Sequence, residues 1–153
     1  MIKIARILFP TDFSQNANAP LAYACAFAEQ NNAELHVLHV IDVGKLAHMS
    51  EFVPIPDADF ESIHATAKQS LGAVVNREWA EKHKVVLSIA KGAPFLEIIR
   101  HAKEHSIDLI VMSTHGRTGL MHLLIGSVAE NVVRKAPCPV LTVHPTDQAF
   151  AMP

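Results

Sequence analysis

Segments rich in β-branched and apolar residues alternate along this chain with segments whose apolar residues recur every three or four positions. The first pattern is typical of buried strands and the second of amphipathic helices. Because strands that are apolar on both faces must be covered on both sides, the alternation predicts an α/β fold: a doubly wound parallel sheet of five strands with helices on both faces. The predicted strands are Ile2–Phe9, Leu35–Ile41, Val85–Ala90, Asp108–Met112 and Val140–Val143.

The segments between these strands predict four helices and one long connection. Helical spacing starts after Ser14, where Ser14 or Asp12 is available to cap the first turn, and ends near Asn32. Residues 43–58 keep no period and contain glycine and proline, so we expect a long connection there. The other helices are predicted from about Asp57 to His83, from Pro94 to His105, and across Val128–Val133 up to Pro137.

Composition excludes several classes of protein. A length of 153 residues predicts a single domain, with residues 145–153 as a loose tail. A hydrophobic share of 50% excludes a disordered chain, and a net charge of −2 provides no positive field for nucleic acid. No apolar run approaches the roughly 18 residues of a membrane span. The two cysteines, Cys25 and Cys138, form no disulfide framework, which favours a reducing cytoplasm.

The segment after the fourth predicted strand is the strongest candidate for a binding site, because ligands of doubly wound sheets bind beyond the carboxyl ends of the strands. Glycine-containing residues 113–119 precede a short apolar segment, and Gly126 opens the next helix. Glycines let the main chain approach an anion, and the N–H groups at a helix N-terminus attract it. One interpretation is therefore a phosphate cradle. The other is that the glycines only shape a turn and a close helix–sheet contact.

Several motifs, in the same order, resemble the universal stress protein family, in particular its ATP-binding branch. The signature of that branch is glycine, two residues, glycine, nine residues, glycine, then serine or threonine. Gly116, Gly126 and Ser127 match its last three elements, whereas Ser113 stands at the first glycine. The resemblance covers residues 3–144, which we expect to form the core of the domain. Its other motifs are Ile7–Ser14, Leu38–Val40, Gly92–Pro94 and Ala136–Leu141.

The resemblance implies the adenine nucleotide alpha hydrolase-like sheet, with strand order 3-2-1-4-5, and an adenine nucleotide across the strand ends. Asp12 would accept a hydrogen bond from the ribose or adenine, and the backbone of Val40 would face the adenine edge. Mg²⁺ would bridge phosphate oxygens, with no metal ligand from the protein. The residues implied to hold the phosphates are Gly116, Arg117, Gly126, Ser127 and Val128, and those that complete the nucleotide site are Pro10, Thr11, Met112 and Ser113.

Ser113 decides whether this analogy holds. If the glycine of the signature needs a positive φ or a very close approach to phosphate, the serine costs affinity. If the position only has to be small, the hydroxyl adds a hydrogen bond.

Ten histidines raise the question of a metal site. His101 and His105 lie four residues apart on one predicted helix face, a spacing that can bind zinc, but no third ligand is apparent in the sequence. His39 follows a strand end and His115 lies near the proposed phosphates. We expect a structural role for each of these histidines.

Three functions remain open. The chain could be an ATP-binding stress-response module that regulates unidentified protein partners, a slow ATPase, or a partner-binding protein without a nucleotide. We expect at most weak ATP hydrolysis, because the glycine segment has no Walker lysine and no carboxylate pair beside it. A homodimer is predicted through Val140–Val143, because this last strand would lie at a sheet edge with no helix after it.

Overall fold

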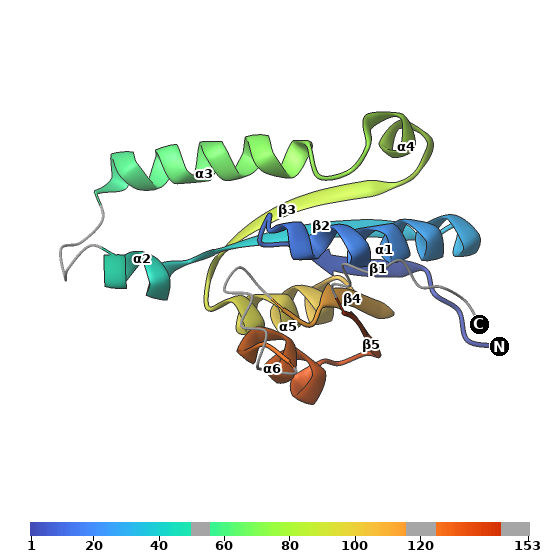
Figure 1. Ribbon diagram of the computed structural model, residues 1–153. Helices are drawn as coiled ribbons and strands as arrows, with labels where there is room; N and C mark the ends of the chain where they lie inside the picture. The colour runs from blue at the N-terminus through green and yellow to red at the C-terminus, as the bar shows by residue number, and fades with distance from the viewer. Residues whose placement is uncertain (50–55, 116–124, 145–153) are drawn as a thin grey trace.

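The computed structural model describes residues 1–49, 56–115 and 125–144 (Figure 1). A five-stranded parallel sheet runs in the order β3-β2-β1-β4-β5, which confirms the predicted α/β fold and its strand order. The elements along the chain are β1 (Arg6–Pro10), the 3-10 helix η1 (Gln15–Ala17), α1 (Asn18–Asn31), β2 (Glu34–Asp42), α2 (Val43–Met49), α3 (Asp57–Gly72), α4 (Arg77–Lys82), β3 (Val85–Gly92), α5 (Pro94–Glu104), β4 (Leu109–Ser113), α6 (Ser127–Lys135) and β5 (Val140–Val143).

Helices cover both faces of the sheet, as predicted (Figure 1). One buried cluster joins α1, α3 and the segment leading into α4 to the sheet, with Ile7, Phe9 and Val37 fully buried at its centre. The other cluster joins α5 and α6 to the opposite face, around Leu8 and Ile110. Within the described part of the chain, no helix is both long and apolar enough to cross a membrane.

The first strand begins later than predicted. It starts at Arg6 rather than Ile2, and the Ile2 side chain is 91% exposed. Arg6 pairs with Glu34, the first residue of β2, and Ile7 pairs with Leu109, the first residue of β4. The strand therefore starts where its two neighbours start, and the β-branched residue before it has no sheet to join.

The predicted long helix from Asp57 to His83 is two helices. The Asn76 side chain accepts a hydrogen bond from Trp79 N at 3.2 Å and so caps α4 as a new helix. Leu71 before the break and Val75 and Trp79 after it pack in one apolar cluster. Periodicity alone does not reveal the break, because both segments bury apolar residues in the same core.

Residues 43–58 also differ from the prediction, because the expected connection begins with α2. Asp42 Oδ1 accepts hydrogen bonds from Gly44 N at 3.0 Å and Lys45 N at 3.2 Å, which stabilises the first turn of that helix. A carboxylate at the end of β2 thus starts a helix whose apolar pattern is too short to be recognised in the sequence.

Candidate functional site

The strand order reverses between β1 and β4, since β1 connects to β2 on one side of it while β4 lies on its other side. The carboxyl ends of β1 and β4 therefore meet at the position where doubly wound sheets bind ligands. Pro10 ends one strand and is followed by Thr11 and Asp12, and Ser113 ends the other. The fold thus brings the two predicted halves of the nucleotide site to the same edge of the sheet.

Thr11 anchors the turn that follows β1. It is buried, its N donates to Leu38 O at 2.8 Å, and its Oγ1 accepts from Phe13 N at 3.1 Å. Its carbonyl accepts from His39 Nδ1 at 2.8 Å, and the His39 ring stacks on Phe13 with 4.1 Å between centroids. Phe13 has a positive φ of 63°, which is rare for a bulky residue and is held here by these contacts. His39 therefore has the structural role that we expected.

Asp12 belongs to this turn, and Val40 belongs to the neighbouring strand β2. Asp12 Oδ1 accepts from Ser14 N at 3.0 Å, so its carboxylate closes the turn before η1, whereas the Ser14 side chain makes no cap hydrogen bond. β2 continues to Asp42, past the last register pair of β1, which is Pro10 with Leu38. Val40 thus belongs to the part of β2 that extends beyond the end of the central strand.

The end of β4 places Met112 and Ser113 differently. The Met112 side chain is buried in the cluster beneath α5 and α6, so this residue offers only its backbone to a ligand at the sheet edge. Ser113 Oγ accepts from His115 N at 3.2 Å. Ser113 does not have a positive φ, so the backbone at this position does not require glycine. A required positive φ is therefore no reason to expect that the serine at this position lowers affinity for a nucleotide.

Thr114 connects the end of β4 to the start of α6. Its side chain is buried, its N donates to Val143 O at 3.1 Å, and its carbonyl accepts from Gly126 N at 2.7 Å. Thr114 is not among the predicted site residues, because nothing in its local pattern distinguishes it from neighbouring loop residues.

Gly126 is the N-cap of α6, with φ −70° and ψ 155°, and its carbonyl accepts from Glu130 N at 2.9 Å. The N–H groups of Ser127 and Val128 in the first turn have no acceptor within the helix, which is the usual environment for an anion. Ser127 is exposed and Val128 is half-buried against the core. The predicted residues Gly116 and Arg117 lie outside the described residues.

A profile of the universal stress protein family matches residues 3–144. The chain belongs to this family. It is 34% identical to Universal stress protein MJ0531 of Methanocaldococcus jannaschii over 90% of its own length and 81% of that protein. The solved structure of MJ0577 from the same organism is 32% identical to this chain, with a TM-score of 0.82. The match covers 96% of this chain and 100% of the MJ0577 chain. A universal stress protein solved in complex with cAMP shares the fold at 23% identity, with a TM-score of 0.62 over 94% of this chain and 99% of that one.

This universal stress protein also contains a histidine cluster that the sequence analysis did not assemble. His36 Nδ1 lies 3.1 Å from His101 Nε2, and one ring nitrogen from each of His36, His101 and His105 lies within 4.8 Å of the others. Burial lowers the pKa of His101 to about 4, with the nearby His105 and His36 adding to the effect. Burial also lowers the pKa of His36, although Glu34 opposes the shift. The third partner for the pair His101 and His105, which was not apparent in the sequence, is therefore His36 of β2.

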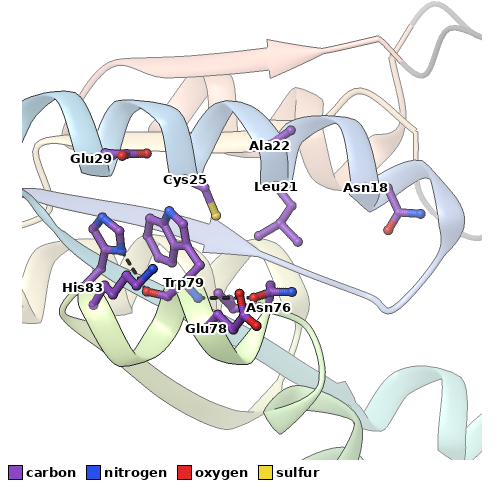
Figure 2. Close-up of a pocket in the computed structure, with 11 residues that line it drawn as sticks. Asn18, Leu21, Ala22, Cys25, Glu29, Asn76, Glu78, Trp79 and His83 are labelled. Carbon is purple, nitrogen blue, oxygen red and sulfur yellow. Dashed lines mark hydrogen bonds between the residues drawn. The ribbon is translucent and has the colours of Figure 1, made fainter.

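A separate pocket of about 560 Å³ lies between α1 and α4 (Figure 2). Figure 2 shows Leu21 and Cys25 of α1 pointing toward Trp79 of α4, whose indole stacks on the His83 ring with 4.0 Å between centroids. Burial and the carboxylate of Glu29 raise the pKa of the Cys25 thiol to about 11, so this cysteine is a poor nucleophile. The pocket contains none of the predicted site residues.

Proposed function

We propose that this universal stress protein binds ATP at the carboxyl ends of β1 and β4 and uses the nucleotide to regulate contacts with protein partners. One observation carries the proposal: Thr114 holds Gly126, the N-cap of α6, directly beside the end of β4 by a hydrogen bond of 2.7 Å. This contact places a helix N-terminus at the reversal point of the sheet, where a phosphate group is stabilised by free N–H groups and by the helix dipole.

The nucleoside would lie against the β1 side of this edge. Asp12 is rigidly placed by its hydrogen bond to Ser14 N and would accept from the ribose or adenine. Pro10 and Thr11 would support the base, and the extension of β2 would present the backbone of Val40 to the adenine edge. The cAMP complex of a family member with the same fold supports an adenine nucleotide as the ligand class.

The phosphates would lie against the β4 side. Ser127 and Val128 would donate from the first turn of α6, together with Gly116 and Arg117 of the signature segment. Gly126, whose N–H donates to Thr114 O, would let the phosphates approach the backbone closely. Met112 and Ser113 would contribute at the end of β4, where the serine adopts a backbone conformation open to any residue. Mg²⁺ would bridge phosphate oxygens, as it does where a protein offers few oxygen ligands.

Regulation is a better account of this site than fast catalysis. Phosphoryl transfer needs an aligned water and neutralisation of the developing charge. Asp12 is the one carboxylate among the proposed site residues, and the signature segment contains no lysine. We expect hydrolysis far slower than the usual enzymatic range of about 1 s⁻¹ or more. A cytoplasmic location is part of this proposal and agrees with the two free cysteines.

The proposal is tested by identifying any nucleotide that the purified protein releases on denaturation, and by titrating the emptied protein with Mg-ATP. Gly126→Val should weaken ATP binding at least about a hundredfold, because several charge-assisted hydrogen bonds depend on close approach to this backbone. The matched control is Gly72→Val at the end of α3, where an added Cβ meets open space. Absence of saturable ATP binding to the wild-type protein would leave the nucleotide-free alternative.

A homodimer through β5 is a second part of the proposal. β5 ends the strand order, so its outer edge has no partner strand among the described residues. The carbonyls of Pro139 and Val143 face β4, since they accept from Ile110 N at 3.0 Å and Thr114 N at 3.1 Å. Because backbone groups alternate along a strand, the N–H of Thr142 points to the open edge. An antiparallel or parallel copy of β5 could pair with it there.

This geometry permits a specific test of the dimer. Thr142→Pro removes an outward N–H while leaving the hydrogen bonds between β4 and β5 intact. We expect light scattering to report a dimer for the wild-type protein and for Thr142→Val, and a monomer for Thr142→Pro. A monomeric wild-type protein at micromolar concentration would contradict the proposed interface.

A further inference from the structure

We propose that His36, His101 and His105 form a binding site for one Zn²⁺ ion at the amino-terminal edge of the sheet. His36 is near the start of β2, and His101 lies in the last turn of α5, with His105 directly after the helix. Because α5 runs opposite to the strands it covers, its C-terminal end lies above the beginning of the sheet. The site is thus at the far end of the sheet from the proposed nucleotide and does not depend on that proposal.

The spacing of the ring nitrogens suits a metal ion. Two nitrogens bound to one tetrahedral zinc at about 2.0–2.1 Å lie roughly 3.3 Å apart. His36 Nδ1 and His101 Nε2 are already 3.1 Å apart, and one ring nitrogen from each of the three histidines lies within 4.8 Å of the others. The His105 ring is 4.1 Å from the His101 ring and 5.2 Å from the His36 ring, measured between centroids. A small rotation of the exposed His105 side chain would complete a three-nitrogen set.

Glu34 orients the first of these ligands. Its Oε1 accepts from His36 Nε2 at 2.8 Å, which leaves the lone pair of Nδ1 directed at His101. A carboxylate that accepts from the second nitrogen of a metal-binding histidine fixes the tautomer and increases the basicity of the ligand. In the metal-free protein, His101 Nε2–H donates to His36 Nδ1, and metal binding requires that this proton move to His101 Nδ1. Both rings then remain neutral.

Two regular elements hold the site rigidly. His36 is 2% exposed within β2, which is paired with β1 and β3 on its two edges, and His101 is 8% exposed on α5. His105 is exposed, so the fourth coordination position would face solvent. Neutral imidazoles favour zinc and other borderline divalent ions over Mg²⁺ or Ca²⁺. Arg6, whose Nη1 donates to His105 O at 3.3 Å, is the register partner of Glu34 on the neighbouring strand.

Zinc titration of untagged, nucleotide-free protein, stripped of metal with EDTA, tests the site. We expect one Zn²⁺ per chain at neutral pH by calorimetry and by metal analysis after dialysis. His105→Ala is the first variant, because its side chain is exposed and its loss leaves the core intact. It should weaken Zn²⁺ binding at least about tenfold, since loss of a ligand costs no less than loss of an outer-shell partner.

The controls separate this site from the other histidines of the chain. His64→Ala removes a histidine of α3 outside the cluster and should bind Zn²⁺ as the wild type does. Glu34→Ala should weaken binding about tenfold or more. Co²⁺ in place of Zn²⁺ should give the visible absorption of a tetrahedral nitrogen site in the wild type and not in His105→Ala. Less than one equivalent of Zn²⁺ bound, or equal binding by His105→Ala and the wild type, would overturn the proposal.

Discussion

The two ends of the sheet are built in different ways. At the carboxyl ends of the strands, main-chain hydrogen bonds such as Thr11 N to Leu38 O and Gly126 N to Thr114 O join separate elements, while side chains such as Asp12 and His39 stabilise the turns. At the amino ends, side chains link separate elements in addition to main-chain bonds such as Glu34 N to Ala5 O and Asp108 N to Arg6 O. Asp108 Oδ2 accepts from Ala5 N at 2.8 Å and Arg6 N at 2.9 Å, and His36 contacts both Glu34 and His101.

This difference determines what each end can bind. Main-chain N–H groups and a helix N-terminus recognise anions whatever the side chains are, provided that the backbone is accessible. Imidazole nitrogens on a strand and a helix recognise a cation at a defined geometry. Under our two proposals, the same sheet therefore has an anion-binding end and a cation-binding end, and each can be changed separately.

The largest effect that we predict is the separate loss of ATP affinity at one end and of Zn²⁺ affinity at the other. Gly126→Val should reduce ATP affinity at least about a hundredfold and leave Zn²⁺ binding unchanged, because the residue adopts φ and ψ values open to valine. His105→Ala should reduce Zn²⁺ affinity at least about tenfold and leave ATP binding unchanged. Calorimetric titration of both variants with both ligands checks this. A variant that impairs both ligands would show that the two ends are coupled.

The Asp108 side chain at the amino end of the sheet should contribute substantially to the free energy of unfolding. Asp108→Ala should lower the free energy of unfolding by about 2 kcal/mol, because it removes the acceptor for two main-chain N–H groups. Asp108→Asn keeps an oxygen at the same place and should remain close to the wild type. Urea unfolding measures both. Equal stability of Asp108→Ala and the wild type would mean that water replaces the carboxylate at no cost.

Replacing a residue of positive φ by glycine should change the free energy of unfolding in opposite directions at the two ends of the sheet. Ser106, at φ 49° just after α5, should gain about 0.5–1 kcal/mol of stability when replaced by glycine, since left-handed backbone favours that residue. Phe13, at φ 63°, should lose about 1 kcal/mol, because the stacking on His39 exceeds the strain that glycine relieves. Thermal unfolding of the two variants compares them. Stabilisation by Phe13→Gly would mean that strain dominates at the carboxyl end.

Local patterns predicted the regular elements well where packing reinforces them. The β-branched runs identify all five strands, and the predicted sheet order 3-2-1-4-5, which rested on the family resemblance, is confirmed. The first strand starts late because its partner strands start there, and the other two errors occur at positions decided by single side chains. Asn76 divides a predicted helix, and Asp42 begins α2 in a predicted connection, because each caps a first turn that apolar periodicity does not record.

The candidate site shows the same division. The signature residues Gly126 and Ser127, and Asp12 after the first strand, are recognisable from order and spacing in the sequence. Their convergence at one edge, the buried link through Thr114 and the negative φ of Ser113 required the folded structure. Whether a serine can stand at the first glycine of the signature depends on the backbone conformation of Ser113, which strand pairing imposes.

The sequence by itself determined the class of fold and the family and supplied the candidate residues for an anion site, because these depend on local periodicity and on short motifs. Only the tertiary structure brought His36 to His101, which are 65 positions apart in the chain. Packing of α5 across β2 sets that contact, since it depends on which face of the strand and which face of the helix meet. Long-range side-chain geometry of this kind leaves no local pattern in the sequence, so a pair of histidines becomes a group of three only in the folded chain.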